Sequence, residues 1–420
     1  MSQSYQHGVY GSELPTSLLP ARNVPTNVLF VVGTAPVQTL AADKPRYIND
    51  LRLYYSRAEF VAEMGWPEAS TTAEFKKYTL CAAADVHFSK YNAAPMMCVN
   101  VFDPKKHMDG DKPDPGKVTT ADIIGGIDAD TLKPTGLECI SEAFPRYRLV
   151  PGCILVPGFD KDPAVGVVMG AKTININGLF ECEAITDIDV EAVSKYTDVP
   201  GYKNENNLVA ERLIVTWPKV ALGDVVYPLS LHLAGGISVT DGNTPTGTPH
   251  VSPSNKQAQI TRAIGAGGKE IWLGRDQNNY LNGEGIVTVD NFDGGWRFWG
   301  NRTAAYPTNT DPKDAFIPIR RFFNWYKNTF ILTYFQKVDS PITRRLIQTI
   351  LDSEQHRLDG FTAQEVILGG RIAFQDFENP TVDIMDGLMR FHLWITPPPP
   401  ARAIYGIFEF DPNYISTLFG

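Results

Sequence analysis

Residues 27–33 read Asn-Val-Leu-Phe-Val-Val-Gly, an apolar run of strand length that ends at a glycine. A run that is apolar at nearly every position is typical of a strand buried on both faces of a sheet. Stretches with helical spacing of apolar residues, at 57–64 and 73–91, alternate with further runs of this kind. The pattern predicts an α/β region with a mostly parallel sheet. The predicted strands are 28–32, 97–102, 153–156, 180–185 and 213–217.

Length and composition place this sheet in a larger soluble chain. The 420 residues are 43% hydrophobic and 20% charged, which predicts two or three domains. We expect an extended N-terminal arm, an α/β region, a C-terminal α+β domain with a small sheet, and a C-terminal arm. Two stretches rich in polar residues, proline and glycine are expected to form exposed loops. The expected boundaries are 1–22, 23–275, 276–398 and 399–420, with the loops near 103–117 and 239–256.

The last third of the chain has its own pattern. Ser340-Pro341 is typical of a helix start, and Gly360 of its end. Two strands are predicted next, at 366–375 and 388–396, followed by a polyproline spacer, Pro397–Pro400. Beyond the spacer, Ala403–Phe410 has the composition of one more strand.

The two ends of the chain need partners. The backbone donors and acceptors of a strand at 403–410 must pair with a sheet edge, and the proline-rich N-terminal segment cannot hold a core of its own. One interpretation is that both ends are donated as strands to neighbouring copies. The other, left open by the pattern alone, is that both fold back onto their own domains.

A basic stretch lies between residues 320 and 357, with seven Lys or Arg residues against three acids in a chain of net charge −9. Such a local excess suggests an acidic partner surface. A solvated helix face with local ion pairs is an equally open interpretation.

The sequence contains no complete motif for catalysis or for cofactor binding. Residues 166–173 approach a P-loop, but Ala171 replaces the glycine that lets the backbone wrap around a phosphate. The seven histidines have no metal-ligand spacing, and no G-x-S-x-G elbow occurs. Five dispersed cysteines predict reduced, buried thiols. We expect no catalytic residue, cofactor or metal; the rival hypothesis is an α/β nucleotide-binding enzyme or a hydrolase.

Composition also limits the partners and the location. The negative charge argues against nucleic-acid binding, and no apolar run approaches the ~20 residues of a membrane-spanning helix. The first ten residues lack the features of a signal peptide. We therefore expect assembly in a cytoplasm, without membrane anchoring.

The chain resembles the tail sheath family of contractile-tailed phages and R-type bacteriocins. The resemblance spans most of the chain and is most specific near the C-terminus, although the loops at 103–117 and 239–256 have no clear counterpart. Where many members carry a glutamate shortly after the proline run, this chain has Ala401-Arg402, which leaves one arm contact in doubt. The matching segments are 7–10, 32–36, 156–159, 295–298, Trp-Gly-Asn-Arg-Thr at 299–303, 317–321, 368–370, 386–388 and 397–400.

The resemblance implies a non-enzymatic structural subunit. Its copies would form stacked sixfold rings around a tail tube protein, with baseplate and tail terminator proteins at the ends. Contraction would drive the tube through a bacterial envelope. The protein would belong to a virion tail or a bacteriocin particle assembled in the host bacterium. The α/β region, called subtilisin-like in the family, would be the outer part, and a shared fold does not carry activity.

The resemblance also implies roles for particular residues. The C-terminal domain would face the tube, and both arms would add strands to the sheets of neighbouring subunits. The expected donors are Val9, Tyr10, Leu14, Ile404, Ile407, Phe408 and Phe410; the acceptor strands carry Ile372, Phe374, Phe391 and Leu393; and Arg320, Arg321, Arg344 and Arg345 are expected to face the tube.

Overall fold

The apolar run at 27–33 forms β1 (Leu29–Gly33), and every residue of this strand is buried. Its side chains alternate between two cores: Phe30 and Val32 lie in one, and Leu29 and Val31 in the other. Both faces of the sheet are therefore covered, as a strand without polar positions requires. The computed structural model describes residues 19–20, 22–93 and 95–419, so Val9, Tyr10 and Leu14 lie outside the described residues.

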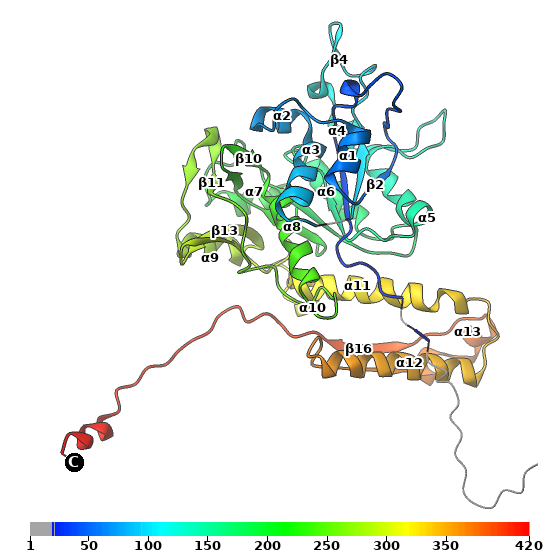
Figure 1. Cartoon of the computed structure of the whole chain (residues 1–420). Coiled ribbons are helices and arrows are strands. Elements are labelled where there is room, and N and C mark those ends of the chain that lie inside the picture. The colour runs from blue at the N-terminus through cyan, green and yellow to red at the C-terminus, as the bar shows by residue number, and fades with distance from the viewer. Residues whose placement is uncertain (1–18, 21, 94, 420) are drawn as a thin grey trace, which may run out of the picture.

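An eight-stranded sheet forms the centre of the larger body, in the order β14-β13-β8-β7-β6-β1-β3-β2 (Figure 1). The six inner strands are parallel, and the two edge strands, β2 and β14, run antiparallel to their neighbours. The predicted mostly parallel sheet is confirmed. The other strands are β2 (Arg52–Tyr54), β3 (Met96–Asn100), β6 (Cys153–Leu155), β7 (Glu183–Asp187), β8 (Leu213–Thr216), β13 (Ile286–Phe292) and β14 (Gly295–Trp299).

Small antiparallel sheets accompany this large one. The order β10-β9-β11-β12 forms a four-stranded sheet, while β4 and β5 form a short projecting hairpin within the loop expected at 103–117 (Figure 1). Their bounds are β4 (Met108–Asp109), β5 (Lys112–Pro113), β9 (Lys219–Leu222), β10 (Val225–Tyr227), β11 (Arg262–Ile264) and β12 (Glu270–Ile271).

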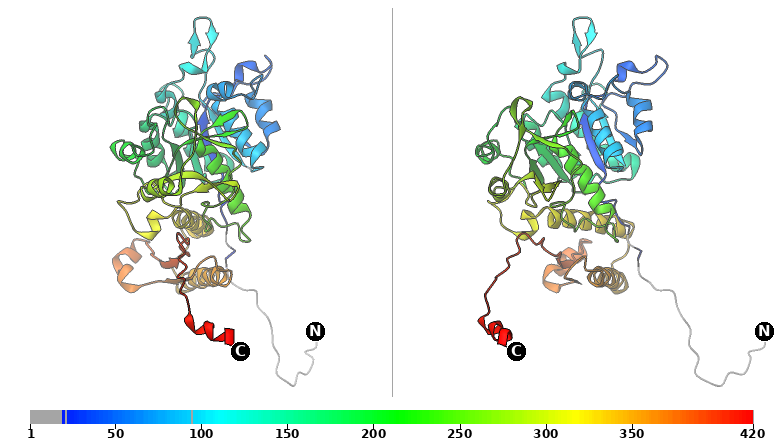
Figure 2. Two further views of the ribbon diagram at one scale, coloured as in Figure 1. Left: turned by 90° about the vertical axis from the view of Figure 1, so that its left-hand side faces the viewer. Right: turned by 60° about the vertical axis from the view of Figure 1, so that its left-hand side comes forward.

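Helices cover both faces of the large sheet (Figures 1 and 2). The helix predicted at 57–64 is present with those bounds, and the Ser56 side chain caps it by accepting from the Glu59 N–H. The stretch predicted at 73–91 forms two α-helices and a π-helical turn, η2 (Asp85–Lys90). The helices of the body are α1 (Arg57–Met64), α2 (Thr72–Lys77), α3 (Thr79–Ala84), α4 (Thr120–Ile124), α5 (Ala143–Tyr147), α6 (Pro163–Lys172), α7 (Val199–Glu205), α8 (Leu229–Gly242), α9 (Arg275–Gly283) and α10 (Pro312–Ala315).

Below the body lies a smaller unit in which α11 (Ile317–Tyr334) separates the large sheet from a second helix and a hairpin (Figure 1). The other elements of this unit are α12 (Arg344–Ala363), β15 (Gly369–Ala373), α13 (Thr381–Met385) and β16 (His392–Thr396). Apolar residues of α11, α12 and the large sheet share one continuous core.

Three boundaries differ from the expectations. The boundary at 275 does not coincide with the edge of the large sheet, because β13 and β14 extend that sheet beside β8. The loop expected from residue 239 begins after Gly242, where α8 ends. The helix expected from Ser340 to Gly360 begins at Arg344, because Thr343 supplies the cap, and continues through Gly360 to Ala363.

Some of the buried side chains carry polar or ionisable groups. All five cysteines are buried free thiols, as predicted. Within the described residues, no helix is both long enough and apolar enough to cross a membrane.

Two buried histidines make folding sensitive to acid. Burial lowers the pKa of His87 to about 4 and the pKa of His232 to about 3. In the unfolded chain a histidine has a pKa of about 6.5. As the pH falls below 6.5, the unfolded chain binds protons that the folded protein excludes. Each histidine then lowers the free energy of unfolding by about 1.4 kcal/mol per pH unit.

We predict that His87→Met reduces the slope of the free energy of unfolding against pH by about one proton between pH 6.5 and pH 4. Chemical denaturation at a series of pH values measures this slope. The exposed His356→Gln is the matched control. Equal slopes for His87→Met and the parent protein would contradict the prediction.

Candidate assembly surfaces

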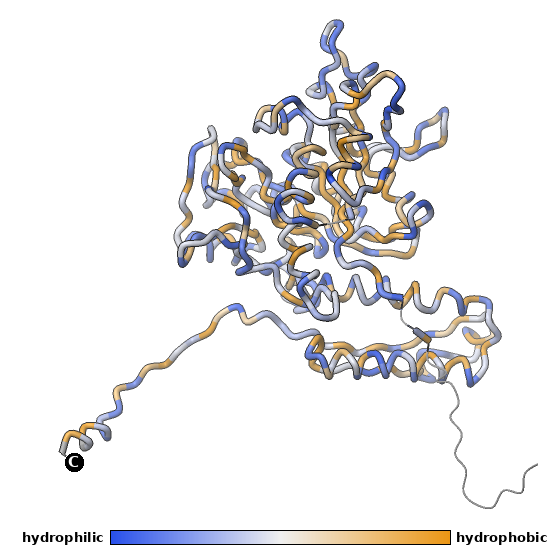
Figure 3. The backbone as a smooth tube through the Cα atoms, in the orientation of Figure 1, coloured by the Kyte–Doolittle hydropathy of each residue, from blue (hydrophilic) through white to orange (hydrophobic). Residues whose placement is uncertain are grey.

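The chain beyond β16 leaves the molecule as an extended segment (Figures 1 and 2). Residues 397–411 contain no helix and no strand. Ile404 is 90% exposed, Ile407 95% and Phe408 97%. Apolar colour accordingly continues along this segment outside the body (Figure 3). Large apolar side chains gathered in water mark a surface that a partner covers.

The hairpin β15–β16 carries the expected acceptor residues. Its strands pair antiparallel, with Ile372 opposite Leu393. Both side chains are partly buried against the core beneath α12. Phe374 and Phe391 lie just beyond the paired residues, with ring centroids 5.3 Å apart. The structure therefore brings all four residues together on one hairpin.

The two edges of this hairpin differ. On β15 the N–H of Ile372 donates to Oε1 of Gln355 at 3.3 Å, and the carbonyl of Gly370 accepts from Nε2 of Gln355 at 3.3 Å. The amide of Gln355, on α12, thus takes the place that a neighbouring strand would occupy. The same Nε2 also donates to Oδ1 of Asp359 at 2.8 Å, so the amide keeps a partner if a strand displaces it.

On β16 the matching groups belong to Leu393 and Ile395. In an antiparallel pair two opposite residues either both point their backbone groups at the partner strand or both point them away from it, and Ile372 and Gly370 point away. Within the described part of the chain, no side chain bonds to these backbone groups. An edge of this kind is ready to pair with another chain. Sequence reasoning missed Gln355, since a glutamine on a helix carries no signal of its own.

The basic stretch divides into two pairs of arginines. Arg320 and Arg321 are buried, at 7% and 3% exposure, so the expectation that they face the tube is wrong for this pair. Arg321 forms two parallel bonds with Asp241, of 3.0 and 2.5 Å, and Arg320 bonds Asp314 at 3.0 Å. The cause is local: α11 lies against the body, where acids from α8 and α10 meet its guanidinium groups.

This contact between α11 and the body is polar and buried. The Asn324 side chain donates to Oε1 of Glu183 at 2.8 Å, and Asn328 accepts from the N–H of Glu181 at 3.0 Å. Burial alone would lower the pKa of Arg321, but Asp241 raises it. This part of the stretch therefore forms local ion pairs, but on a buried face and not on the solvated helix face of the other interpretation.

Arg344 and Arg345 lie exposed in the first turn of α12. Neither forms an ion pair with any residue that the structure describes. Positive charges are unfavourable at a helix N-terminus, where the helix dipole is itself positive. An acidic partner would relieve this cost.

The segment that resembles a P-loop is a helix. Residues 166–172 lie within α6, and a Cβ on Gly166 would come 2.7 Å from Leu208. Lys172 is paired with Glu138. A phosphate-binding loop between a strand and a helix is absent at this point of the structure, so the rival hypothesis of a nucleotide-binding enzyme loses its support.

The carboxyl ends of parallel strands are where α/β proteins usually bind ligands. At the end of β7 the acidic side chains are buried and bonded within the protein. Asp187, at the end of β7, accepts from the Thr216 hydroxyl at 2.6 Å and from the Ser230 N–H at 3.1 Å. Asp160 accepts from the Asp187 N–H at 2.9 Å. Burial raises the pKa of both carboxyl groups. Among the described residues there is also no cluster of three groups suited to a metal ion.

The Trp-Gly-Asn-Arg-Thr segment at 299–303 follows β14 and lies against the residues that lead into α11. The Arg302 guanidinium lies 3.7 Å from the ring centroid of Phe316. The Thr303 N–H donates to the Ala315 carbonyl at 3.1 Å, and the Ile317 N–H donates to the Asn301 carbonyl at 3.0 Å. The motif therefore fixes the start of α11 and is structural, not catalytic.

Together these features define a class of protein: a structural subunit with an α/β sheet covered on both faces, an exposed apolar arm and a hairpin whose β16 edge has unpaired backbone groups. Such a molecule is built to pair with copies of itself or with other chains.

Comparison with known proteins gives the family. No family model matches the chain. It is 28% identical over 329 residues to the tail sheath protein of Burkholderia phage BcepMu, covering 74% of this chain and 65% of that protein, just under two thirds of its length. It is 24% identical over 431 residues to the tail sheath protein of Escherichia phage P2, covering 99% of this chain and 98% of that protein.

Solved sheath structures have the same fold. The contracted sheath of the extracellular contractile injection system PVC is similar with a TM-score of 0.68 at 15% identity, over 98% of this chain and 99% of that one. The contracted helical sheath of the anti-feeding prophage gives 0.65 at 17% identity, over 96% and 98%. The chain belongs to the contractile tail sheath protein family of phages and contractile injection systems.

The first prediction from these surfaces concerns Gln355. We expect Gln355→Leu to change the free energy of unfolding by no more than about 1 kcal/mol, since the bared backbone groups can bind water. We expect the purified subunit to associate at lower concentration, because the β15 edge becomes free.

Light scattering against concentration measures this association. Gln348→Leu is the matched control, since Gln348 bonds Asp352 at 2.7 Å on the same helix, in the same i,i+4 arrangement as Gln355 and Asp359, without touching β15. If both variants associated alike, Gln355 would not protect the edge.

The second prediction concerns the buried ion pair. Asp241→Ala leaves the Arg321 guanidinium with Glu183 alone, at 3.7 Å, and should cost about 3–5 kcal/mol. Denaturant unfolding measures the loss, and the exposed Arg344→Ala should stay within about 0.5 kcal/mol of the parent protein. Replacing both partners, as Asp241→Leu with Arg321→Met, should recover most of the loss; no recovery would contradict this account.

Proposed function

We propose that this sheath subunit polymerises as stacked sixfold rings around a tail tube and contracts to drive the tube through a bacterial envelope. The observation that carries the proposal is the arm at 403–410, whose apolar side chains are exposed in a molecule that also carries a hairpin with one unpaired edge, on β16. When the arm of one copy pairs with the hairpin of another, the backbone groups of the arm gain hydrogen-bond partners and its apolar side chains are buried.

The C-terminal arm adds a strand to the hairpin of a second copy. Strand alternation places Ile404, Phe408 and Phe410 on the face toward the acceptor's core, and Ile407 on the other face. Burial of each large side chain contributes ~1.5–3 kcal/mol. Together with the backbone bonds, this outweighs the cost of ordering the arm. Residues 8–14 of a third copy, which carry Val9, Tyr10 and Leu14, supply a strand to the same sheet.

Contraction then occurs as rigid subunits rotate relative to one another while their arms bend. The buried contact between α11 and the body keeps each subunit rigid, while the segment from Pro397 onward connects it to its neighbour. Subunits can rotate and gain interface area while the donated strands stay paired. The stored energy lies in interfaces not made in the extended state, so no nucleotide is needed.

Other partners follow from the position of the subunit. Arg344 and Arg345 remain candidates for a tube-facing pair and would meet an acidic band on the tail tube protein. Such exposed pairs contribute ~0.2–1 kcal/mol each, which suits a grip that must release during contraction. Baseplate and tail terminator proteins bind the two ends of the sheath, which is assembled in the cytoplasm of the host and functions as part of a phage tail or an injection particle.

We predict that deleting residues 401–420 leaves a folded, monomeric subunit that does not polymerise, because every residue of this segment whose burial the structure describes is exposed. Circular dichroism tests the fold, and electron microscopy tests the polymers. Phe408→Asp in the full chain should weaken polymerisation in the same direction. Normal polymers from the deletion variant would refute arm donation, and a molten monomer would show that the arm belongs to its own domain.

A further inference from the structure

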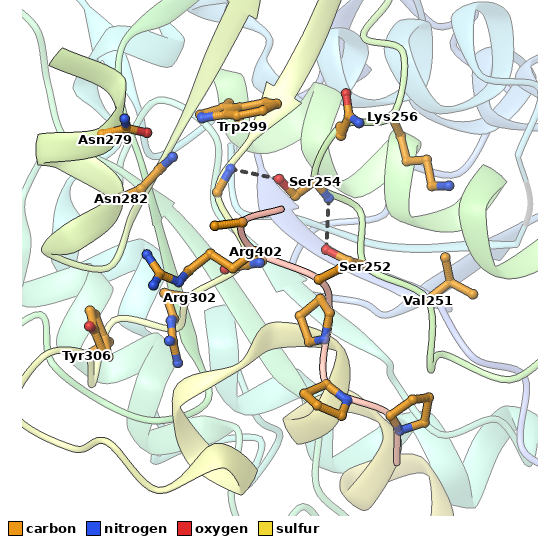
Figure 4. A pocket seen from close by; sticks show the side chains of 18 of the residues that line it. Val251, Ser252, Ser254, Lys256, Asn279, Asn282, Trp299, Arg302, Tyr306 and Arg402 are labelled. Carbon is orange, nitrogen blue, oxygen red and sulfur yellow. Dashed lines mark hydrogen bonds between the residues drawn. The ribbon is translucent and has the colours of Figure 1, made fainter. Parts of the chain in front are cut away.

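A groove of about 900 Å³ runs between the body and the start of the C-terminal arm. One wall comes from the loop at 250–256 and from α9, and the other from residues 398–403 of the arm itself (Figure 4). Trp299 and Arg302, of the segment that fixes α11, also line the groove.

The charges in this groove are unbalanced. Lys256, Arg302 and Arg402 line it, and none of them forms an ion pair with any residue that the structure describes. Arg275 also lines it but is paired with Asp290 at 3.1 Å. The acid on the lining is Glu365. The groove therefore holds an excess of positive charge.

The positive charge of Arg302 is in an unfavourable environment in this groove. It is partly buried between the rings of Tyr306 and Phe316, with centroids 4.3 and 3.7 Å from the guanidinium carbon. Burial lowers the pKa of Arg302, and the positive charge of Arg402 lowers it further. A half-buried cation whose charged neighbour is another cation is a site that a carboxylate would stabilise.

We infer that this groove binds the acidic end of the C-terminal arm of a second copy, through Glu409 and Asp411. The inference rests on the proposed exchange of arms and adds a second anchor to it, beyond the donated strand.

The composition of the arm supports this occupant. Residues 403–420 contain two acids, Glu409 and Asp411, and no lysine or arginine. Both acidic residues are exposed. The arm of the same copy forms a wall of the groove and then extends away from the molecule (Figure 2), and neither Glu409 nor Asp411 belongs to the groove lining.

The direction of strand addition also supports it. A strand that runs antiparallel to β15 travels from Ala373 toward Gly369. Its end then arrives beside Leu368 and Glu365, and Glu365 already belongs to the groove lining. A donated 403–410 strand in this orientation delivers residues 409–411 to the mouth of the groove. The donor thus joins the β15 edge, where it displaces the amide of Gln355.

A designed disulfide tests the location. We combine Asp411→Cys with Lys256→Cys in the full chain and oxidise the assembled polymer. The natural cysteines are buried and should not react. Under denaturing conditions we expect a ladder of cross-linked multimers. Asp130→Cys with Lys256→Cys is the control, because Asp130 is an exposed acid on the body. If the polymer forms but the 411–256 pair gives no more cross-linking than the control, the inference is wrong.

Charge reversal tests the chemistry. We expect Glu409→Lys with Asp411→Lys to raise the critical concentration for polymerisation about fivefold at low salt, and the difference to shrink at high salt. Adding Lys256→Glu and Arg402→Glu should restore the value of the parent protein. Asp130→Lys is the control for net charge.

The outcomes separate the two proposals. If deletion of 401–420 abolishes polymers while the arm reversal behaves like Asp130→Lys, arm donation stands and the basic groove is not its anchor. If the deletion variant polymerises normally, the proposed function itself fails. Restoration by the fourfold charge swap supports both proposals.

Discussion

The ion pair between Arg321 and Asp241 fixes the geometry on which the assembly surfaces depend. It lies inside the protein, with 3% and 1% exposure of the two side chains, and joins α11 to α8 of the body. Because breaking such a pair leaves a buried charge without a partner, the joint is costly to open. The hairpin and the start of the arm are thus held at a set angle to the large sheet. Beyond Pro397, residues 398–411 form no helix and no strand, so this part of the chain is not held by the joint.

A subunit of this kind must stay soluble alone and yet pair readily in its assembly. The arm is exposed and apolar, and one hairpin edge, on β16, has free backbone groups. The other edge is covered by the amide of Gln355, which offers one donor and one acceptor in the positions of a neighbouring strand. Side-chain cover of this sort lowers the risk of wrong pairing and costs little to remove, since Gln355 retains Asp359 as a partner.

The large sheet shows how an α/β fold can serve assembly without catalysis. At the end of β7, Asp160 and Asp187 are bonded within the protein, and the glycines of the near-P-loop lie inside a helix. The fold is shared with the sheaths of contractile injection systems, in which the chain's architecture recurs over almost its full length. Charged residues gather at three places on its surface: the arm, the groove and the first turn of α12.

The sequence alone determined the parallel strands, the helix at 57–64, the buried thiols and the family. These follow from local patterns, because a strand buried on both faces must be apolar throughout, and short motifs keep their spacing along the chain. It also placed Ile372, Phe374, Phe391 and Leu393 on neighbouring strands. Only the tertiary structure decided that Arg320 and Arg321 are buried. In the sequence, arginines that face a partner cannot be told from arginines that pair with Asp314 and Asp241 inside the protein. The same holds for Gln355 and for the groove around Arg302, whose partners are distant in sequence and are brought together only by packing.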